Sequence, residues 1–81
     1  NLMRNIMSEN EKAIIKLLND KGGAKYTDIE PLMKMGSHDK FWTTFSTICS
    51  LISAGVIVSE NKYPSTYTLT SYGKSKINEV L

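Results

Sequence analysis

The sequence predicts a mainly α-helical domain with one small β-hairpin, in the order helix, helix, helix, hairpin, helix. Two observations carry this prediction. Apolar residues recur at helical spacing over the first two-thirds of the chain, and after Gly55 the pattern changes to short runs rich in β-branched and aromatic residues. The chain has 81 residues, of which 41% are hydrophobic and 22% charged. This composition is typical of a small globular protein, so we expect residues 1–81 to form a single domain.

The first helix is expected over residues 8–21. Ser8 followed by Glu11 forms a capping box, in which the two residues satisfy free amide groups at the start of the helix. Isoleucine and leucine side chains then recur on one helical face, and Gly22 supplies the left-handed exit that the end of a helix favours. Residues 1–7 either extend this helix or form an N-terminal arm.

Two further helices follow. The second is predicted to start near Asp28 and to stop at Gly36, and the third to be capped by Ser37 and to end after Ala54. Projected at about 100° per residue, four apolar residues of the third helix form one stripe, which we expect to face the core: Phe41, Phe45, Ile48 and Ile52, with Thr44, Cys49 and Leu51 at its margins.

The hairpin is predicted from the segments VIVSE, residues 56–60, and STYTLT, residues 65–70. A two-stranded hairpin is marginal alone in water, so it is expected to pack against the helices. Thr70 or Ser71 caps the last helix. Gly73 lies inside this helix, where it lowers the intrinsic helix stability by about 1 kcal/mol relative to Ala.

Several functional classes find no support in the sequence. The formal net charge of +2 is compatible with a polyanionic partner and with much else. A single cysteine excludes an internal disulfide framework and fits a reducing cytoplasm. No apolar run approaches a membrane span, and no set of residues has the spacing of a catalytic or metal site. We therefore expect neither an enzyme nor a cofactor.

The face of the third helix turned away from the phenylalanines is rich in hydroxyl side chains. Ser and Thr lower helix preference by about 0.5 kcal/mol each relative to Ala, so they are an unusual choice for a face that merely meets water. Such a face suits close approach to DNA, because Ser and Thr bond to phosphates and base edges. Neutral drift and a protein partner remain as alternatives. The face comprises Lys40, Thr43, Ser46, Thr47 and Ser50, with Trp42 and Ser53 at one edge.

Two short motifs carry a family resemblance. Leu51 followed by Gly55-Val56-Ile57, and Tyr67-Thr68-Leu69-Thr70 followed by Gly73, resemble the L-x-x-x-G-L-I and Y-x-L-T-x-x-G spine of MarR-like and related small repressors. The resemblance covers residues 8–81 and implies the winged helix-turn-helix fold. It also implies that residues 37–50 form a recognition helix in the DNA major groove. Residues 60–65 would then form the tip of a wing that touches the neighbouring backbone.

The expected function is therefore double-stranded DNA binding by a small transcriptional regulator of repressor type. We expect a cytoplasmic, nucleoid-associated protein of a prokaryote, an archaeon or one of their viruses. We also expect a homodimer, because a monomer with few basic residues neutralises few phosphates. The alternative is a winged-helix module that assembles with other proteins and binds no DNA. The candidate DNA contacts are Lys40, Trp42, Thr43, Ser46 and Thr47 on the third helix, Lys62 and Tyr63 on the wing, and Lys25 and Thr27 before the second helix.

Overall fold

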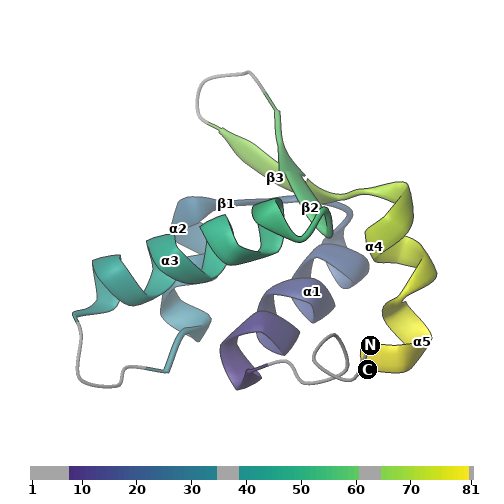
Figure 1. Cartoon of the computed structure of the whole chain (residues 1–81). Helices are drawn as coiled ribbons and strands as arrows, with labels where there is room; N and C mark the ends of the chain where they lie inside the picture. Colours follow the sequence, from purple (N-terminus) through teal and green to yellow (C-terminus); the bar gives the residue numbers. More distant parts are fainter. Residues whose placement is uncertain (1–7, 35–38, 61–64, 81) are drawn as a thin grey trace.

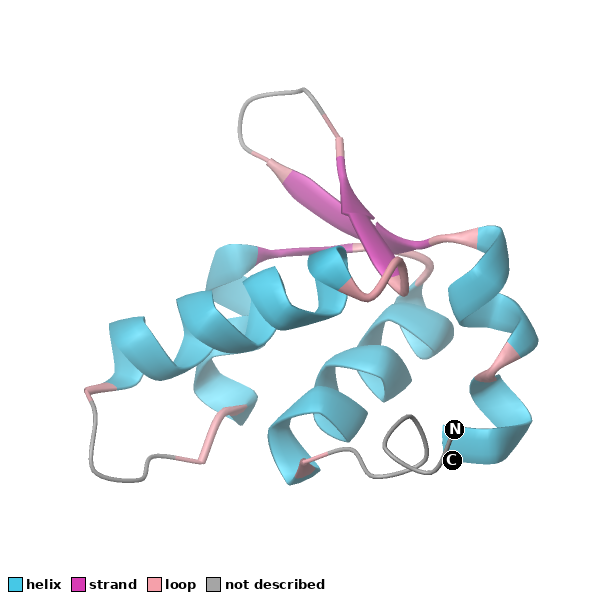
Figure 2. Ribbon diagram, in the orientation of Figure 1, coloured by secondary structure: helices cyan, strands magenta, loops and turns pink. Residues whose placement is uncertain are grey.

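The computed structural model describes residues 8–34, 39–60 and 65–80, and the path of the chain is shown in Figure 1. Within these residues, four helical segments precede a hairpin and two short helices follow it. Figure 2 shows the helices in cyan and the strands in magenta. The elements are α1 (Glu9–Lys21), β1 (Ala24–Lys25), α2 (Tyr26–Ile29), the 3-10 helix η2 (Glu30–Leu32), α3 (Lys40–Ser53), β2 (Ile57–Ser59), β3 (Thr66–Leu69), α4 (Ser71–Ser75) and α5 (Ile77–Val80).

The strands form a three-stranded antiparallel sheet in the order β1-β3-β2. The hairpin predicted from the sequence is confirmed, with Ile57 opposite Leu69 in its register. The sequence did not predict β1, whose Ala24 and Lys25 pair with Tyr67 and Thr66 on the other side of β3. Because β1 leads directly into α2, this pairing joins the base of the hairpin to the start of the second helix.

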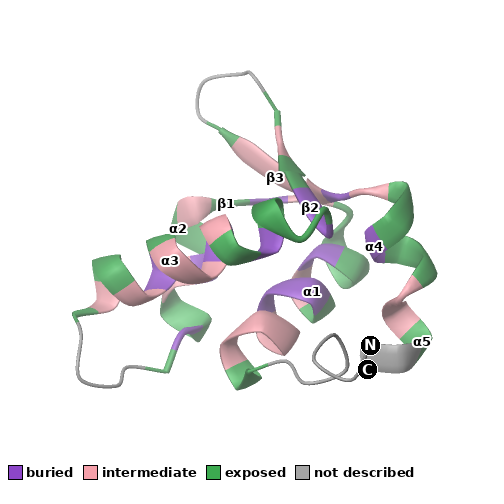
Figure 3. Ribbon diagram, in the orientation of Figure 1, coloured by how far each residue is buried: buried purple, intermediate pink, exposed green. Residues whose placement is uncertain are grey.

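The core lies between the helices and the sheet. Buried positions fall on α1, α3, β2 and the end of β3, as the purple segments of Figure 3 show. Nearly all of these side chains are aliphatic, which gives an 81-residue chain a small apolar interior. The buried hydrophobic residues are Ile14, Ile15, Leu18, Ala24, Ile29, Met33, Ile48, Leu51, Val56, Ile57 and Leu69.

The predicted core stripe of the third helix is wrong in three of its four members. Phe41, Phe45 and Ile52 are 60%, 47% and 39% exposed, respectively, and only Ile48 is buried. The buried face runs instead along Thr44, Ile48 and Leu51. At the helical angle of about 100° per residue, this face is rotated by roughly 60° from the predicted stripe.

Thr44 explains this rotation. Its side chain is 0% exposed, and its hydroxyl donates a 2.7 Å hydrogen bond to the carbonyl oxygen of Lys40 one turn earlier. With its polar atom satisfied inside the helix, Thr44 can enter the core at little cost. The phenylalanines are thereby turned outward.

Most of the predicted helix ends are confirmed. The capping box of Ser8 and Glu11 is formed, and Gly22 ends α1 in the left-handed region at φ 80°. Thr70 caps α4 by accepting a 2.9 Å bond from the Gly73 amide. The N-cap of α3 is Asp39, whose carboxylate accepts from the Trp42 amide at 2.7 Å. The predicted cap Ser37 lies outside the described residues.

The second and last helices differ from the predicted ones. The second begins at Tyr26, two residues before Asp28, and ends as 3-10 helix at Leu32. The last one is divided at Lys76 into α4 and α5. Within the ranges that the structure describes, no helix has the length and apolarity needed to cross a bilayer.

Gly73 fits closely under the hairpin. A Cβ atom placed on it would overlap the carbonyl oxygen of Val56 and lie 3.1 Å from the carbonyl carbon. The same Val56 oxygen accepts a 3.0 Å hydrogen bond from the Thr70 amide, while the Thr70 hydroxyl donates to the nearer carbonyl oxygen of Gly55 at 2.5 Å. Gly73 is therefore required for α4 to pack against the start of the hairpin.

Candidate nucleic-acid interface

The surface of α3 that does not face the core has two sides. One side, here called the aromatic flank, consists of Phe41, Phe45 and Ile52. The other, the hydroxyl flank, consists of Thr43, Ser46, Thr47 and Ser50. Trp42 lies between the two flanks and is 50% exposed. Across its whole length from residue 40 to residue 53, α3 carries a single charged side chain, that of Lys40.

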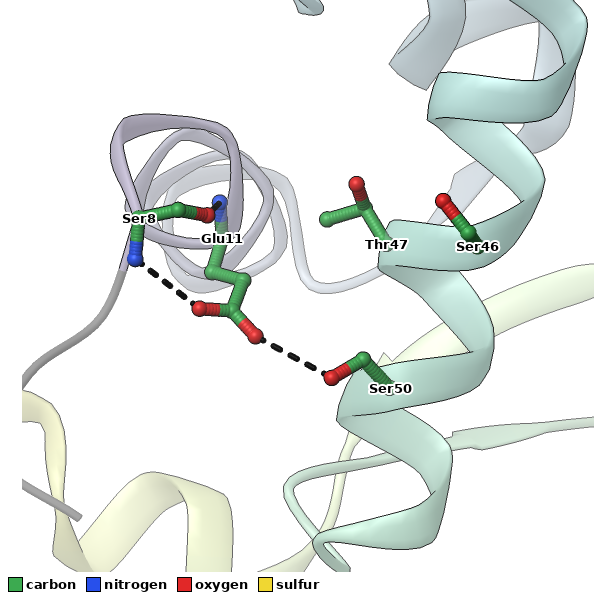
Figure 4. A pocket seen from close by; sticks show the side chains of 5 residues that line it. All are labelled: Ser8, Glu11, Ser46, Thr47 and Ser50. Atoms are coloured by element: carbon green, nitrogen blue, oxygen red, sulfur yellow. Dashed lines mark hydrogen bonds between the residues drawn. The ribbon is translucent and has the colours of Figure 1, made fainter. Parts of the chain in front are cut away.

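The hydroxyl flank borders an open hollow of about 370 Å³, lined by Ser8, Glu11, Ser46, Thr47 and Ser50 (Figure 4). The hollow thus gathers two predicted DNA contacts, Ser46 and Thr47, at the start of α1. The hollow also contains the carboxylate of Glu11, and the sequence did not indicate that this residue lies beside the third helix. One carboxylate oxygen accepts from the Ser8 amide at 2.9 Å and the other from the Ser50 hydroxyl at 3.3 Å.

The hydroxyls of this flank are partly engaged by the helix itself. Thr47 and Ser46 both donate to the carbonyl oxygen of Thr43, at 2.7 and 3.2 Å. A hydroxyl that donates internally still accepts through its lone pairs. Toward an outside partner this flank therefore offers mainly acceptors, and the Glu11 carboxylate beside it repels phosphates. These features favour contact with donors on base edges over contact with the DNA backbone.

The aromatic flank continues onto α2. The rings of Phe41 and Phe45 are stacked, with centroids 5.9 Å apart and an interplanar angle of 11°. The Tyr26 ring lies 6.1 Å from Phe41, tilted by 45°. Reasoning from the sequence missed this exposed cluster, because it placed both phenylalanines in the core. The signal that could have revealed the cluster is the position of Thr44 on the helix. Thr44 belongs to neither flank and shares one face with Ile48 and Leu51, which are buried.

Tyr26 has a perturbed titration. Its hydroxyl donates a 3.1 Å hydrogen bond to the Glu30 carboxylate. Partial burial, followed by this hydrogen bond and the charge of Glu30, raises the pKa of the phenol above its usual 10.0. Tyr26 is therefore a neutral hydrogen-bond donor at physiological pH, held in a fixed orientation beside Phe41.

The remaining predicted contacts are distributed as follows. Lys25 and Thr27 are exposed on either side of Tyr26, so they accompany the aromatic flank and not the hydroxyl flank. Lys40 is half-buried at the first residue of α3. The predicted wing contacts Lys62 and Tyr63 lie outside the described residues. Among the described residues, no three His, Cys, Asp or Glu side chains gather as metal ligands.

No protein-family model matches this chain, and no curated protein matches it. Solved structures are similar to it along most of its length. YusO from Bacillus subtilis superimposes with a TM-score of 0.77 at 16% identity, covering 98% of this chain and 56% of that one. The MarR family transcription regulator SP03579 gives a TM-score of 0.74 at 18% identity, covering 96% of this chain and 52% of the other.

A third similar structure is BpsR of Bordetella bronchiseptica, whose DNA binding is regulated by 6-hydroxynicotinic acid. It matches with a TM-score of 0.72 at 18% identity, over 90% of this chain and 51% of BpsR. The chain thus spans about half the length of these proteins, and at such identities the likeness shows the fold alone. That fold is the winged helix-turn-helix seen in MarR-type transcriptional regulators, as the sequence predicted.

Proposed function

We propose that this chain is the DNA-binding unit of a transcriptional regulator, with α3 in the major groove of double-stranded DNA and the β2–β3 hairpin against the neighbouring backbone. One observation carries the proposal: a long side of α3 is exposed, and the β2–β3 hairpin projects from the molecule beside this helix (Figure 1). Similar solved structures include BpsR, a DNA-binding protein, and a MarR family transcription regulator. The shared fold supports the proposal, whereas the functions of these proteins are known only for those proteins.

The dimensions and the polarity of α3 suit a groove. A helix with its side chains is about 10–12 Å across, and the major groove is about 12 Å wide. Since α3 itself carries no carboxylate between residues 40 and 53, the part of its exposed surface away from Glu11 can approach the phosphates that border the groove. We propose Trp42, Thr43 and Ser46 for the base edges. Ser46 and Thr47 both line the hollow that contains Glu11, so we propose that they meet hydrogen-bond donors on base edges and not phosphates.

Phosphate contacts would come from the two ends of this surface. Lys40 begins α3, and Lys25 and Thr27 lie at the start of α2 beside the aromatic flank. On the wing, Lys62 and Tyr63 are proposed as backbone contacts on the strength of their sequence position. A net charge of +2 supports only a few phosphate contacts per chain. We therefore propose a homodimer that reads two half-sites about 34 Å, or one helical turn, apart.

A salt titration tests DNA binding directly. The affinity for duplex DNA should fall with salt, with a log–log slope that corresponds to a few phosphates per chain, at about 0.9 per phosphate. Ser46→Glu should weaken binding at least tenfold, because it places a carboxylate in the groove. Ser71→Glu, which adds the same charge on α4, should change the affinity less than twofold. Undetectable DNA binding at low salt would refute the proposal.

One observation favours a second function, that of a protein-assembly module. Interface cores are depleted in charged residues and enriched in aromatic ones. The exposed side of α3 has this composition, with Phe41, Trp42 and Phe45 on an almost uncharged helix. If the chain is a protein-assembly module, the salt titration will show no DNA binding. Phe45→Ala will then abolish binding of the partner protein.

A further inference from the structure

The aromatic flank needs an explanation that salt-dependent DNA binding does not supply. Two stacked phenylalanine rings and an isoleucine stand exposed on the helix that we assign to the groove. Exposed apolar side chains scattered singly are normal on a protein surface, but a stacked pair of exposed rings, with a further exposed apolar residue on the same helix face, marks a candidate contact site. We infer that the aromatic flank contacts thymine 5-methyl groups in the major groove. This inference rests on the proposed DNA binding and specifies its sequence preference.

A second copy of the chain is a poor occupant of this flank. A buried aromatic side chain covers about 200 Å², so two rings and a tryptophan that are roughly half exposed offer about 300 Å². With Ile52 the flank and Trp42 together provide about 350–400 Å² per copy, or about 750 Å² for a symmetric pair. Stable interfaces need about 1,000 Å² or more. Pairing along this flank alone would therefore be weak.

The charges around the aromatic flank indicate that DNA would contact the middle and the C-terminal part of this flank. Three carboxylates gather near its N-terminal end, and each accepts a hydrogen bond: Asp28 from the Lys25 amide, Glu30 from the Tyr26 hydroxyl and Asp39 from the Trp42 amide. From Phe45 to Ile52 the helix carries no charge of either sign. A polyanionic duplex can approach this part closely, while Lys25 and Lys40 offset the carboxylates at the other end.

Thymine is the base whose major-groove edge presents an apolar group, and contact between phenylalanine and its methyl is an established recognition mode. The Phe41 and Phe45 centroids are 5.9 Å apart, and base pairs rise by about 3.4 Å. The two rings therefore span between one and two base-pair steps. Ile52 lies seven residues beyond Phe45, which is about 10 Å along the helix, or three further steps. The expected half-site is a short A·T-rich run.

Uracil provides the test, because a dT→dU exchange removes the methyl group and leaves base pairing and hydrogen-bonding atoms in place. The probe is a duplex selected from random oligonucleotides, prepared once with thymine and once with uracil in the half-sites. The thymine duplex should bind at least fivefold more tightly to the unmodified chain. Phe45→Ala should lose this preference and bind both duplexes alike. The control Leu32→Ala, at an exposed residue of η2, should keep the preference.

The possible outcomes of this experiment distinguish failure of the thymine contact from failure of the proposed DNA binding. Salt-dependent binding with equal affinity for both duplexes overturns the thymine contact and leaves DNA binding intact. No binding of either duplex overturns the proposed function itself. A third outcome would also overturn the inference: Phe45→Ala abolishes self-association in sedimentation, and the variant keeps the preference for the thymine duplex. The flank would then be assigned to contact with a second copy of the chain. Phe45→Ala is not expected to unfold the chain, since this side chain is half exposed.

Discussion

Replacing Gly73 by alanine should destabilise the domain, although alanine is the better helix former. Inside a helix the exchange gains about 1 kcal/mol. Here the new Cβ would overlap the Val56 carbonyl oxygen and lie 3.1 Å from its carbon, and neither atom is the end of a flexible side chain. Overpacking of this kind costs about 1–3 kcal/mol. Displacing the Val56 oxygen also weakens the hydrogen bond that it accepts from the Thr70 amide, which contributes about 1 kcal/mol.

The balance is a net loss of about 1–3 kcal/mol, because one favourable term of about 1 opposes unfavourable terms of about 2–4. A chain of 81 residues has a total stability of about 4–12 kcal/mol. At about 4–8 °C per kcal/mol, the midpoint of thermal unfolding should fall by about 5–20 °C. Circular dichroism of the two proteins during heating measures this shift.

Gly23→Ala is the matched control for this experiment. A Cβ on Gly23 would meet the Thr68 methyl at 3.3 Å and the Thr66 methyl at 3.4 Å, which are close contacts but not overlaps. The free energy of unfolding should change by less than about 1 kcal/mol. If Gly73→Ala proves as stable as the unmodified chain, α4 does not pack against Val56 in the way described, and the reasoning fails.

Two further predictions concern Thr44 and Tyr26. Thr44→Val keeps the shape of the buried side chain and removes a hydroxyl bonded within its own helix, so stability should change by less than about 1 kcal/mol. Thr44→Ser deletes the buried methyl and should cost about 1 kcal/mol, as chemical denaturation can measure. The raised pKa of Tyr26 means that the folded state holds the phenol proton more tightly than the unfolded state. The resulting stability is present below pH 10 and is lost as the pH rises through the folded pKa. Glu30→Gln should lower that pKa in an absorbance titration; an unchanged value would contradict the assigned cause.

The features predicted correctly from the sequence are those decided by neighbouring residues. The Ser8–Glu11 capping box, the glycine exit at Gly22 and the Thr70 cap each involve residues within a few positions of one another. The hairpin was predictable for the same reason. In contrast, β1 has two residues, too few for any periodicity, and it exists because β3 offers it an edge more than forty positions later along the chain.

The candidate site was predicted less well, for two physical reasons. Thr44 was placed at the margin of the core stripe and not at its centre, whereas a hydroxyl that donates within its own helix lets Thr44 occupy the core while Phe41 and Phe45 stay exposed. The hydroxyl flank was recognised, but its acidic neighbour was not. Glu11 and Ser50 are 39 positions apart, and only the packing of α1 beside α3 brings them together.

The pairing of β1 with β3 restricts how this molecule can adapt to a ligand. Lys25 is fixed opposite Thr66 in the sheet, and the next residue, Tyr26, already belongs to α2. No spare backbone separates the two elements, so a tilt of the hairpin must displace the start of α2 and, through the Tyr26–Phe41 ring contact, press on α3. Adjustment at the hairpin is therefore transmitted to α2 and α3, and these three elements respond to a ligand as one unit.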